Sequence, residues 1–444
     1  MYRFAKESAD AMQLEIDKVV RDPIQAVNDR EEARALSAEA DEAADSEGDV
    51  QAAIENLHTL AGMRAVLQKS LETGGASTAC LKSIQTYIRW GGFNTERGFT
   101  LSVENNDSAF IRMRNTNLAI ESITKIIDDA WAFIKEYYEK ITKWFREFYM
   151  KYFSQLGRAK NEIEHLLKET KRTKNTIYTG EEKFTNLQAI ARLKIGGEVK
   201  PILSIPVFNS SFRALTTLLT QWGEDNVNAL VPRLERFLEM PEVLPDELVI
   251  SFINPDTSIF VETDFVGYSP SSKLVKTYGL PVTMPGDAII LGYFAADSRR
   301  VYTYEEIEEI ASLVRIFMGT NQESTHKVVS EVSALTAQEV YDLLKILETL
   351  CDDALGADSV NIALNDSKRK LMKVVDKITE SLRKNVGADK DGNVKHRFAK
   401  SAATRLQAID KVCVLPFTQF STTALSIILA GLDYCKFSLK QLNH

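Results

Sequence analysis

The residue types that most often do chemistry lie scattered through this 444-residue chain, without the spacing that a catalytic or metal site needs. The sequence contains no P-loop, no GxGxxG after a strand, no HExxH and no GxSxG. The histidines are isolated from one another: His58, His165, His326, His396 and His444. We therefore expect no catalytic residue, no cofactor and no metal, and interpret the protein as a non-enzyme.

Three acidic or basic clusters could in principle form sites. The segment that starts at Asp389 begins like a calcium-binding loop, but its twelfth residue is Lys400, where a bidentate Glu is required. The neighbouring Asp352 and Asp353 are more typical of a solvated helix surface than of a catalytic dyad. The basic run over 395–405 could contact phosphate, but a solvated face is the favoured interpretation.

Composition and cysteine usage narrow the class of protein. The cysteines form no CxxC pair, which favours buried free thiols in a reducing compartment: Cys80, Cys351, Cys413 and Cys435. The net charge of −8 gives the whole molecule no attraction for nucleic acid or anionic lipid. The longest apolar run, 424–432, is about half as long as a membrane-spanning helix, and no secretory signal is recognised. These features predict a soluble protein.

The strongest signal is a segment at 128–153, which holds ten aromatic residues in 26 positions. Alternating spacings of three and four place seven of its residues on one stripe of a helix: Trp131, Ile134, Tyr138, Ile141, Phe145, Phe148 and Tyr152. The opposite face is charged, and Glu136 with Lys140 and Glu139 with Lys143 have the spacing of ion pairs. The pattern predicts an amphipathic helix that packs along its aromatic stripe.

Three kinds of partner could cover this aromatic surface. Burial against other helices or another subunit is favoured, with transient membrane contact and a further ligand as alternatives. The segment has five positive and five negative charges, which argues against a lipid surface. A second group of aromatic residues widens the apolar band beyond what one partner helix would cover: Phe133, Tyr137, Trp144, Tyr149 and Phe153.

The rest of the chain divides into regions that frame this helix. We expect an acidic, Ala/Glu-rich arm over 1–104, a long aromatic amphipathic helix over 105–180, an α+β module over 195–303 and a C-terminal helical bundle over 304–444. The fold class is therefore predicted as mainly α with a small central α+β module, the long helix being packed in a bundle.

Several elements inside these regions are specific enough to be tested. Strand-like runs at 247–254 and 257–266 predict a hairpin, and a third strand is expected at 287–295. A helix is expected from Thr303 to Gly319, because Thr303 and Glu306 form a capping-box pattern at its start.

Four segments, taken in order, resemble the internal head proteins of tailed bacteriophages with large myovirus-type heads. They are "LSVENNDSAFIRMRNTNLAIESI" (101–123), "LPVTMPGDAIIL" (280–291), "SALTAQEVYDLLKILETLC" (333–351) and "ALSIILAGLDYCKFSLKQ" (424–441). The resemblance extends over most of the chain, although each motif is short.

The resemblance implies a structural protein that is packaged inside the phage head and passes through the host cytoplasm during assembly. A prohead protease of such phages cuts after Glu in a small-or-aliphatic-x-Glu context. This implies a candidate cut after Glu104, with Glu121 and Glu39 as weaker candidates, and makes 1–104 a candidate propeptide. Other expected partners are further head proteins or copies of this chain, while the net charge gives no support to contact with packaged DNA.

One alternative function stays open at this point. The aromatic helix of an ejected, membrane-active protein would leave its bundle and perturb the host envelope during DNA delivery.

Overall fold

The computed structural model describes residues 47–90, 108–172, 182–239, 259–265, 267–297, 302–320, 329–357 and 410–442, together with scattered positions between 363 and 408. Most of these residues lie in helices, and the strands are short and few in number. The predicted fold class, mainly α with a small β content, is confirmed.

One helix sets the length of the molecule. Helix α5 runs without a break from Ala109 to Thr170, a span of about 93 Å for its 62 residues. It begins where the Ser108 hydroxyl accepts a hydrogen bond from the Ile111 N–H at 3.2 Å, and Lys168 lies in its last turn. Gly157 lies buried within the continuous helix.

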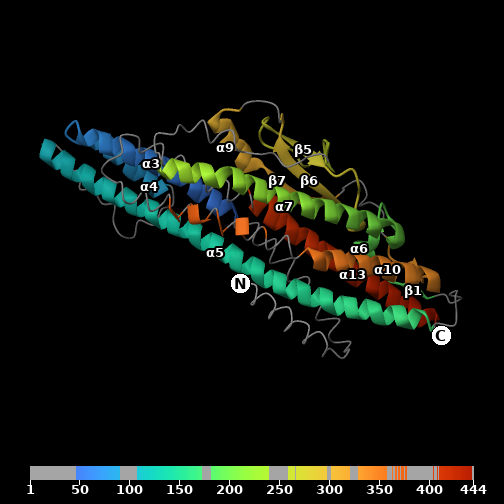
Figure 1. Ribbon diagram of the computed structural model, residues 1–444. Coiled ribbons are helices and arrows are strands. Elements are labelled where there is room, and N and C mark those ends of the chain that lie inside the picture. Colours follow the sequence, from blue (N-terminus) through green and yellow to red (C-terminus); the bar gives the residue numbers. More distant parts are fainter. Residues whose placement is uncertain are drawn as a thin grey trace.

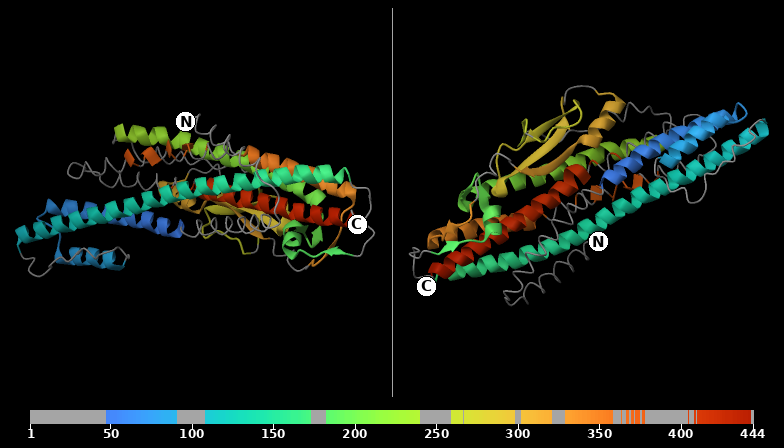
Figure 2. Two further views of the ribbon diagram at one scale, coloured as in Figure 1. Left: turned by 90° about the horizontal axis from the view of Figure 1, so that it is seen from below. Right: turned by 180° about the vertical axis from the view of Figure 1, so that it is seen from behind.

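Four other helices pack along α5 (Figure 1, Figure 2). Helices α10 (Ala337–Gly356) and α13 (Leu415–Leu442) cover its C-terminal half, while α3 (Glu47–Leu71) and α4 (Thr78–Trp90) lie at its N-terminal end. Helix α7 (Pro201–Glu239) packs against α10 and α13. Because α13 touches α5, α7 and α10, most of its residues are buried, and it forms the centre of the bundle.

Two described helices are long and apolar enough to cross a membrane. One candidate span is Pro201–Ala229 in α7, and the other is Lys411–Leu442, which joins the π-helical turn η4 (Asp410–Val414) to α13. Within the second span, 78% of the most apolar window is buried inside the protein, against 39% for the first. A core helix passes the same test, so the burial of α13 accounts for its composition.

A four-stranded antiparallel sheet lies beside the bundle in the order β4 (Val261–Glu262), β5 (Val275–Gly279), β6 (Ala288–Ala295), β7 (Arg315–Thr320). Strand β6 confirms the strand predicted at 287–295. The strand expected at 257–266 is reduced to β4, which pairs with β5, and its predicted partner at 247–254 lies outside the described residues.

The helix predicted from Thr303 to Gly319 is correct at its start and wrong at its end. Both hydrogen bonds of the Thr303–Glu306 capping box are present, but α9 (Tyr304–Leu313) stops at Leu313. The chain then forms β7, in which Ile316 is buried and pairs with Gly292 of β6. Pairing along a complete neighbouring strand decides the structure of a short apolar run whose periodicity alone is ambiguous.

The segment 280–291 contains a turn through which the sheet contacts the helical part of the protein. Short strands β2 (Lys194–Ile195) and β3 (Glu198–Val199) follow helix α6 (Leu187–Leu193), and the 3₁₀ turn η2 (Pro285–Asp287) packs against them. Asp287 is buried at a positive φ of 56°, accepts a hydrogen bond from the Gly196 N–H at 2.8 Å and lies 3.2 Å from the Lys194 ammonium. Another short pair, β1 (Lys183–Phe184) with β8 (Val332–Ser333), lies near the C-terminal end of α13.

Two region boundaries differ from those expected. Residues 47–90 form helices packed on the body of the protein, whereas 1–104 was expected to be an acidic arm. Residues 304–320 form α9 and β7, so they belong to the sheet region and not to the C-terminal bundle.

Candidate functional site

The predicted aromatic stripe faces the interior of the bundle. Six of its seven side chains are buried: Trp131, Ile134, Tyr138, Phe145, Phe148 and Tyr152. The side chain of the seventh, Ile141, lies outside the described residues. Spacings of three and four keep a stripe on one side of a helix, so the side of α5 that faces its neighbours is the aromatic one.

Phe417 of α13 is the main aromatic contact across this interface. Its ring stacks on Tyr149 with centroids 5.8 Å apart and meets Phe145 edge-on at 6.3 Å. The Tyr149 hydroxyl donates a hydrogen bond to the carbonyl of Ala357, just after α10, at 2.9 Å. A buried tyrosine is well placed when its hydroxyl finds such an acceptor, so Tyr149 ties three helical segments together.

The second aromatic group is also covered within the chain, with one exception. Tyr149 is buried, Phe153 lies 4.8 Å from it, and Tyr137 and Trp144 are half-buried against the start of α13. Phe133 is 45% exposed. Contacts inside a single chain therefore account for the widened apolar band, apart from Phe133.

The charged face of α5 is exposed, and its ion pairs differ in part from those expected. Lys140 pairs with Glu136 at 2.8 Å, as the spacing predicts, but Lys143 approaches Glu147 at 3.8 Å instead of Glu139. Exposed pairs of this kind contribute about 0.3–0.5 kcal/mol each. This face adds little to stability and leaves the aromatic side to determine how α5 packs.

One polar pair is sealed inside the interface. The hydroxyl of Tyr152 faces Ser421 of α13, and neither group makes a hydrogen bond of ordinary geometry. Burial raises the pKa of Tyr152 far above its usual value, so the phenol is neutral at physiological pH.

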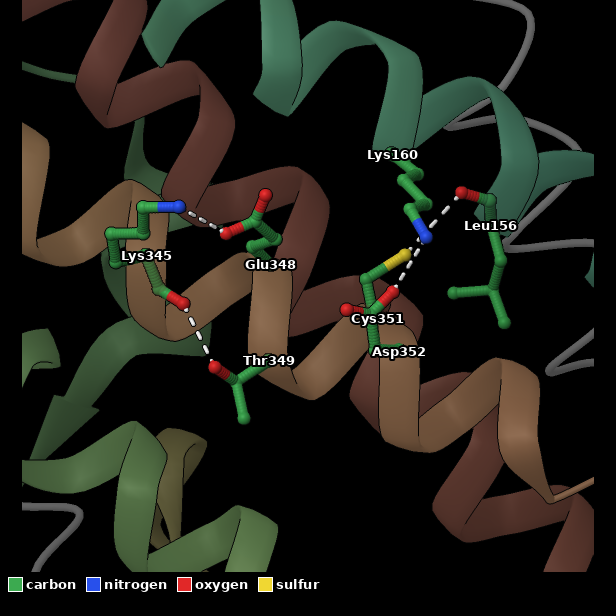
Figure 3. A network of polar contacts seen from close by, with 7 residues as sticks. All are labelled: Leu156, Lys160, Lys345, Glu348, Thr349, Cys351 and Asp352. Carbon is green, nitrogen blue, oxygen red and sulfur yellow. Dashed lines mark hydrogen bonds and ion pairs between the residues drawn. The ribbon is translucent and has the colours of Figure 1, made fainter.

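Cys351 belongs to a contact between α10 and α5 and is not a reactive centre (Figure 3). Its thiol donates to the carbonyl of Leu156 at 3.4 Å, and the adjacent Asp352 pairs with Lys160 at 2.8 Å. Burial, assisted by Asp352, raises the pKa of Cys351 to about 12. Since the thiolate is the nucleophile, a raised pKa makes this cysteine unreactive.

The two aspartates after Cys351 tie α10 to different helices. Asp353 accepts a hydrogen bond from Asn209 at 2.6 Å and pairs with Arg213 at 2.5 Å, both on α7, while Asp352 is bound to α5. Their carboxylates serve separate contacts, which agrees with the interpretation that they do not form a catalytic dyad.

Cysteine labelling in the native protein should follow burial. Cys351, Cys413 and Cys435 are buried, and Cys80 is half-buried. An alkylating agent at pH 8 is expected to modify Cys80 at least about tenfold faster than Cys351 or Cys435, because burial raises the pKa of both. Mass spectrometry of digested protein measures the rates, and equal labelling in denaturant is the control. Rapid native modification of Cys351 would contradict the packing of α10 on α5.

Of the three candidate cleavage positions, the structure places only Glu121, because Glu39 and Glu104 lie outside the described residues. Glu121 is exposed on α5, but Ala119 and Ile120 before it are buried and helical. A protease that binds an extended substrate would have to unwind α5 to reach this bond.

The remaining candidate residues add no site. Among the described residues, no group of His, Cys, Asp or Glu is arranged to hold a metal ion. His165 lies 3.9 Å from Glu169 on the exposed face of α5. His326, His396, His444 and the segment that starts at Asp389 lie outside the part that the structure describes.

Comparison with known proteins gives one match. Residues 15–215 match the family model of the phiKZ-like phage internal head proteins, a region that contains α3, α4, α5, α6 and the start of α7. No curated protein and no solved structure matches the chain. The family indicates a structural component inside a phage head. The match over residues 15–215 confirms the resemblance to phage internal head proteins that the sequence shows.

Proposed function

We propose that this protein is a non-enzymatic structural component packaged inside the phage head, and that its long helix serves as the rigid axis of the molecule. The family match over residues 15–215 carries the proposal, because it contains the whole of α5. The aromatic side of this helix packs against α10 and α13. This arrangement favours a structural role for α5 over a catalytic one.

The proposed partners are other head proteins or further copies of the chain. The exposed face of α5 carries side chains of both charges, and a mixed surface of this kind favours partners with complementary charge patterns over a uniformly charged polymer. Direct contact with packaged DNA receives no support from a net charge of −8.

The proposed maturation step is a cut by the prohead protease after Glu104. Residues 1–104 carry 11 Lys and Arg against 18 Asp and Glu, a net charge of −7, so residues 105–444 carry only −1 of the chain's −8. Separating this acidic part from the body would reduce repulsion between the protein and packaged DNA. Glu121 is a poorer substrate, because it lies inside α5.

Mass spectrometry of purified virions is the direct test. We expect peptides of this chain in the virion, with a new N-terminus at Asn105. Changing Glu104→Gln should leave the 104–105 bond intact, whereas the matched change Glu121→Gln on the exposed side of α5 should leave trimming unaltered. Absence of the chain from virions would overturn the structural role; presence with an uncut 104–105 bond would overturn only the cleavage.

A membrane-active role is the second candidate, and α7 is the observation that favours it. Between Pro201 and Trp222 this helix has one charged residue, Arg213, and it exposes Leu203 and Val207. The aromatic stripe of α5 is a weaker candidate, because lipid would reach it only if the bundle opened.

Dye leakage from liposomes separates the two functions. If the head role is correct, the full chain at micromolar concentration should release no more dye than an inert protein of similar size. Leakage that disappears in a Leu203→Lys, Val207→Lys double variant would favour the membrane role instead, with α7 as the contact.

A further inference from the structure

We infer that residues 47–90 stay bound to α5 after the chain is cut between α4 and α5, so that the trimmed protein consists of two chains held by a non-covalent interface. The inference rests on the proposed cleavage after Glu104. It concerns the contact between the helices on either side of the cut, α3 and α4 on one side and α5 on the other.

Helix α3 has its own apolar stripe. Leu57, Leu60, Arg64 and Leu67 follow spacings of three, four and three, and all four side chains are buried. They face the N-terminal third of α5, which packs along α3 and buries Ile120, Ile123 and Ile127. Two complementary apolar faces of this kind lose their burial together if the helices separate.

The turn after α3 clamps the first residues of α5. The Ala76 N–H donates to the Thr116 hydroxyl at 2.8 Å, and that hydroxyl donates in turn to the Arg112 carbonyl at 2.7 Å. Arg112 donates back to the carbonyl of Gly74 at 3.4 Å. The bonds from Ala76 to Thr116 and from Arg112 to Gly74 connect residues about forty positions apart in the chain, on opposite sides of the proposed cut. Neither of them depends on the connecting segment.

Gly75 fits this clamp because it lacks a side chain. Its φ of +95° is a conformation that favours glycine, and a Cβ built there would lie 2.6 Å from backbone atoms of Arg112 and Met113. The backbone of the turn therefore lies directly against the backbone of α5, at a distance that another residue type would not allow.

Helix α4 reinforces the fragment. Leu81, Ile84 and Ile88 are buried on one side of α4, and the Tyr87 hydroxyl donates to the Asn56 side chain of α3 at 3.3 Å. Residues 47–90 thus form a helical hairpin, in which the turn and this hydrogen bond connect α4 to α3. Such a unit can stay assembled when its covalent link to α5 is lost.

Charge gives no reason to expel this hairpin. Residues 1–46 carry 6 basic and 12 acidic residues, a net charge of −6, whereas residues 47–104 carry 5 and 6, a net charge of −1. The acidic excess lies before α3. Burial of Arg64 on α3 lowers its pKa, because the loss of solvation outweighs the attraction by Asp128 of α5. After a single cut at Glu104, residues 1–46 stay joined to the hairpin, so its retention also keeps their acidic excess on the body. The reduced repulsion from DNA would then require a second cut before α3, for which Glu39 is the candidate.

The test uses the full chain with a recognition sequence for a site-specific protease placed within residues 101–107. After complete cleavage in native buffer, the two fragments should co-elute from a size-exclusion column and separate only in denaturant. Elution of the smaller fragment by itself would overturn the inference. Failure of the viral protease to cut at Glu104 would leave this result unchanged, so the proposed function and the inference can fail separately.

Variants locate the interface that holds the fragments. Leu60→Ala should weaken their association at least about tenfold, since it removes a buried side chain from the contact. Val66→Ala, on the same helix at a side chain that is 58% exposed, is the matched control and should co-elute as the unmodified protein does. Circular dichroism before cleavage checks that both variants are folded. Equal association of the two folded variants would show that α3 is not held through its leucine stripe and would overturn the inference.

Discussion

Truncating Phe145 to alanine is expected to lower the free energy of unfolding by about 3–5 kcal/mol. Phe145 is 1% exposed, stacks on Phe148 with centroids 6.4 Å apart and meets Phe417 of α13 edge-on. Alanine would leave a cavity among rings that belong to two helices, and neither helix can move without losing its other contacts. Denaturant unfolding followed by circular dichroism measures the change.

Phe133→Ala on the same helix is the matched control. Because Phe133 is 45% exposed, its loss should change the unfolding free energy by less than about 1 kcal/mol. Equal effects at the two positions would contradict the packing of the stripe against α13. A large effect at Phe145 alone shows that the aromatic stripe is an internal contact, which is what a structural role requires.

The spacing of side chains in the aromatic segment was enough to predict which side of α5 faces inward. Seven positions spaced by three and four define a direction that only a helix provides, and the charged residues opposite them exclude burial on both sides. The sequence left open what covers Tyr137, Trp144 and Tyr149, because their partners come from residues 357 and 415–417, more than 200 positions away. Contacts that distant are set by topology, which local periodicity does not specify.

The same reasoning explains what was missed in the first hundred residues. Leu57, Leu60 and Leu67 carry a helical stripe, but many alanines and acidic residues precede them, and the average composition predicted an arm. Averaging over a long window hid a short periodic signal that the 3-4-3 spacing through Arg64 would have revealed. The buried Asp287 was also missed, because its partners, Lys194 and Gly196, lie about ninety positions away and form no motif with it.

The end of α9 shows a different limit. "VRIFMG" continues an apolar pattern that fits a helix and a strand equally well, and no glycine or proline separates it from the helix before it. The choice is made by β6, which offers a complete edge for pairing from Ala288 to Tyr293. A strand formed by pairing with a distant neighbour lies beyond what its own residues can indicate.

Replacing Lys411 with methionine is expected to stabilise the protein by about 1–3 kcal/mol at pH 7. Lys411 lies in the π-helical turn before α13, and its ammonium donates to the carbonyl of Ser312 at 3.0 Å. Burial lowers the pKa of Lys411 to about 8 from its ordinary value of 10.5. Methionine keeps the length of the side chain and removes the half-buried charge, at the loss of the hydrogen bond to Ser312.

The pH dependence of this gain follows from the direction of the shift. Below about pH 8, Lys411 is protonated in both the folded and the unfolded chain, so the full cost of burying the charge is present. Between about pH 8 and 10.5 the folded protein loses the proton while the unfolded chain keeps it, so the stability of the unmodified protein rises with pH. The advantage of the methionine variant should therefore shrink from pH 7 to pH 10.

Lys440→Met provides the control, since Lys440 is exposed near the end of the same helix. Its effect on the unfolding free energy should stay within about 0.5 kcal/mol and should not change between pH 7 and pH 10. Unfolding curves in urea at pH 7 and pH 10 measure the unfolding free energy of both variants. If Lys411→Met instead destabilises the protein at pH 7, the hydrogen bond to Ser312 contributes more than desolvation of the ammonium costs. The turn before α13 would then depend on a charged lysine.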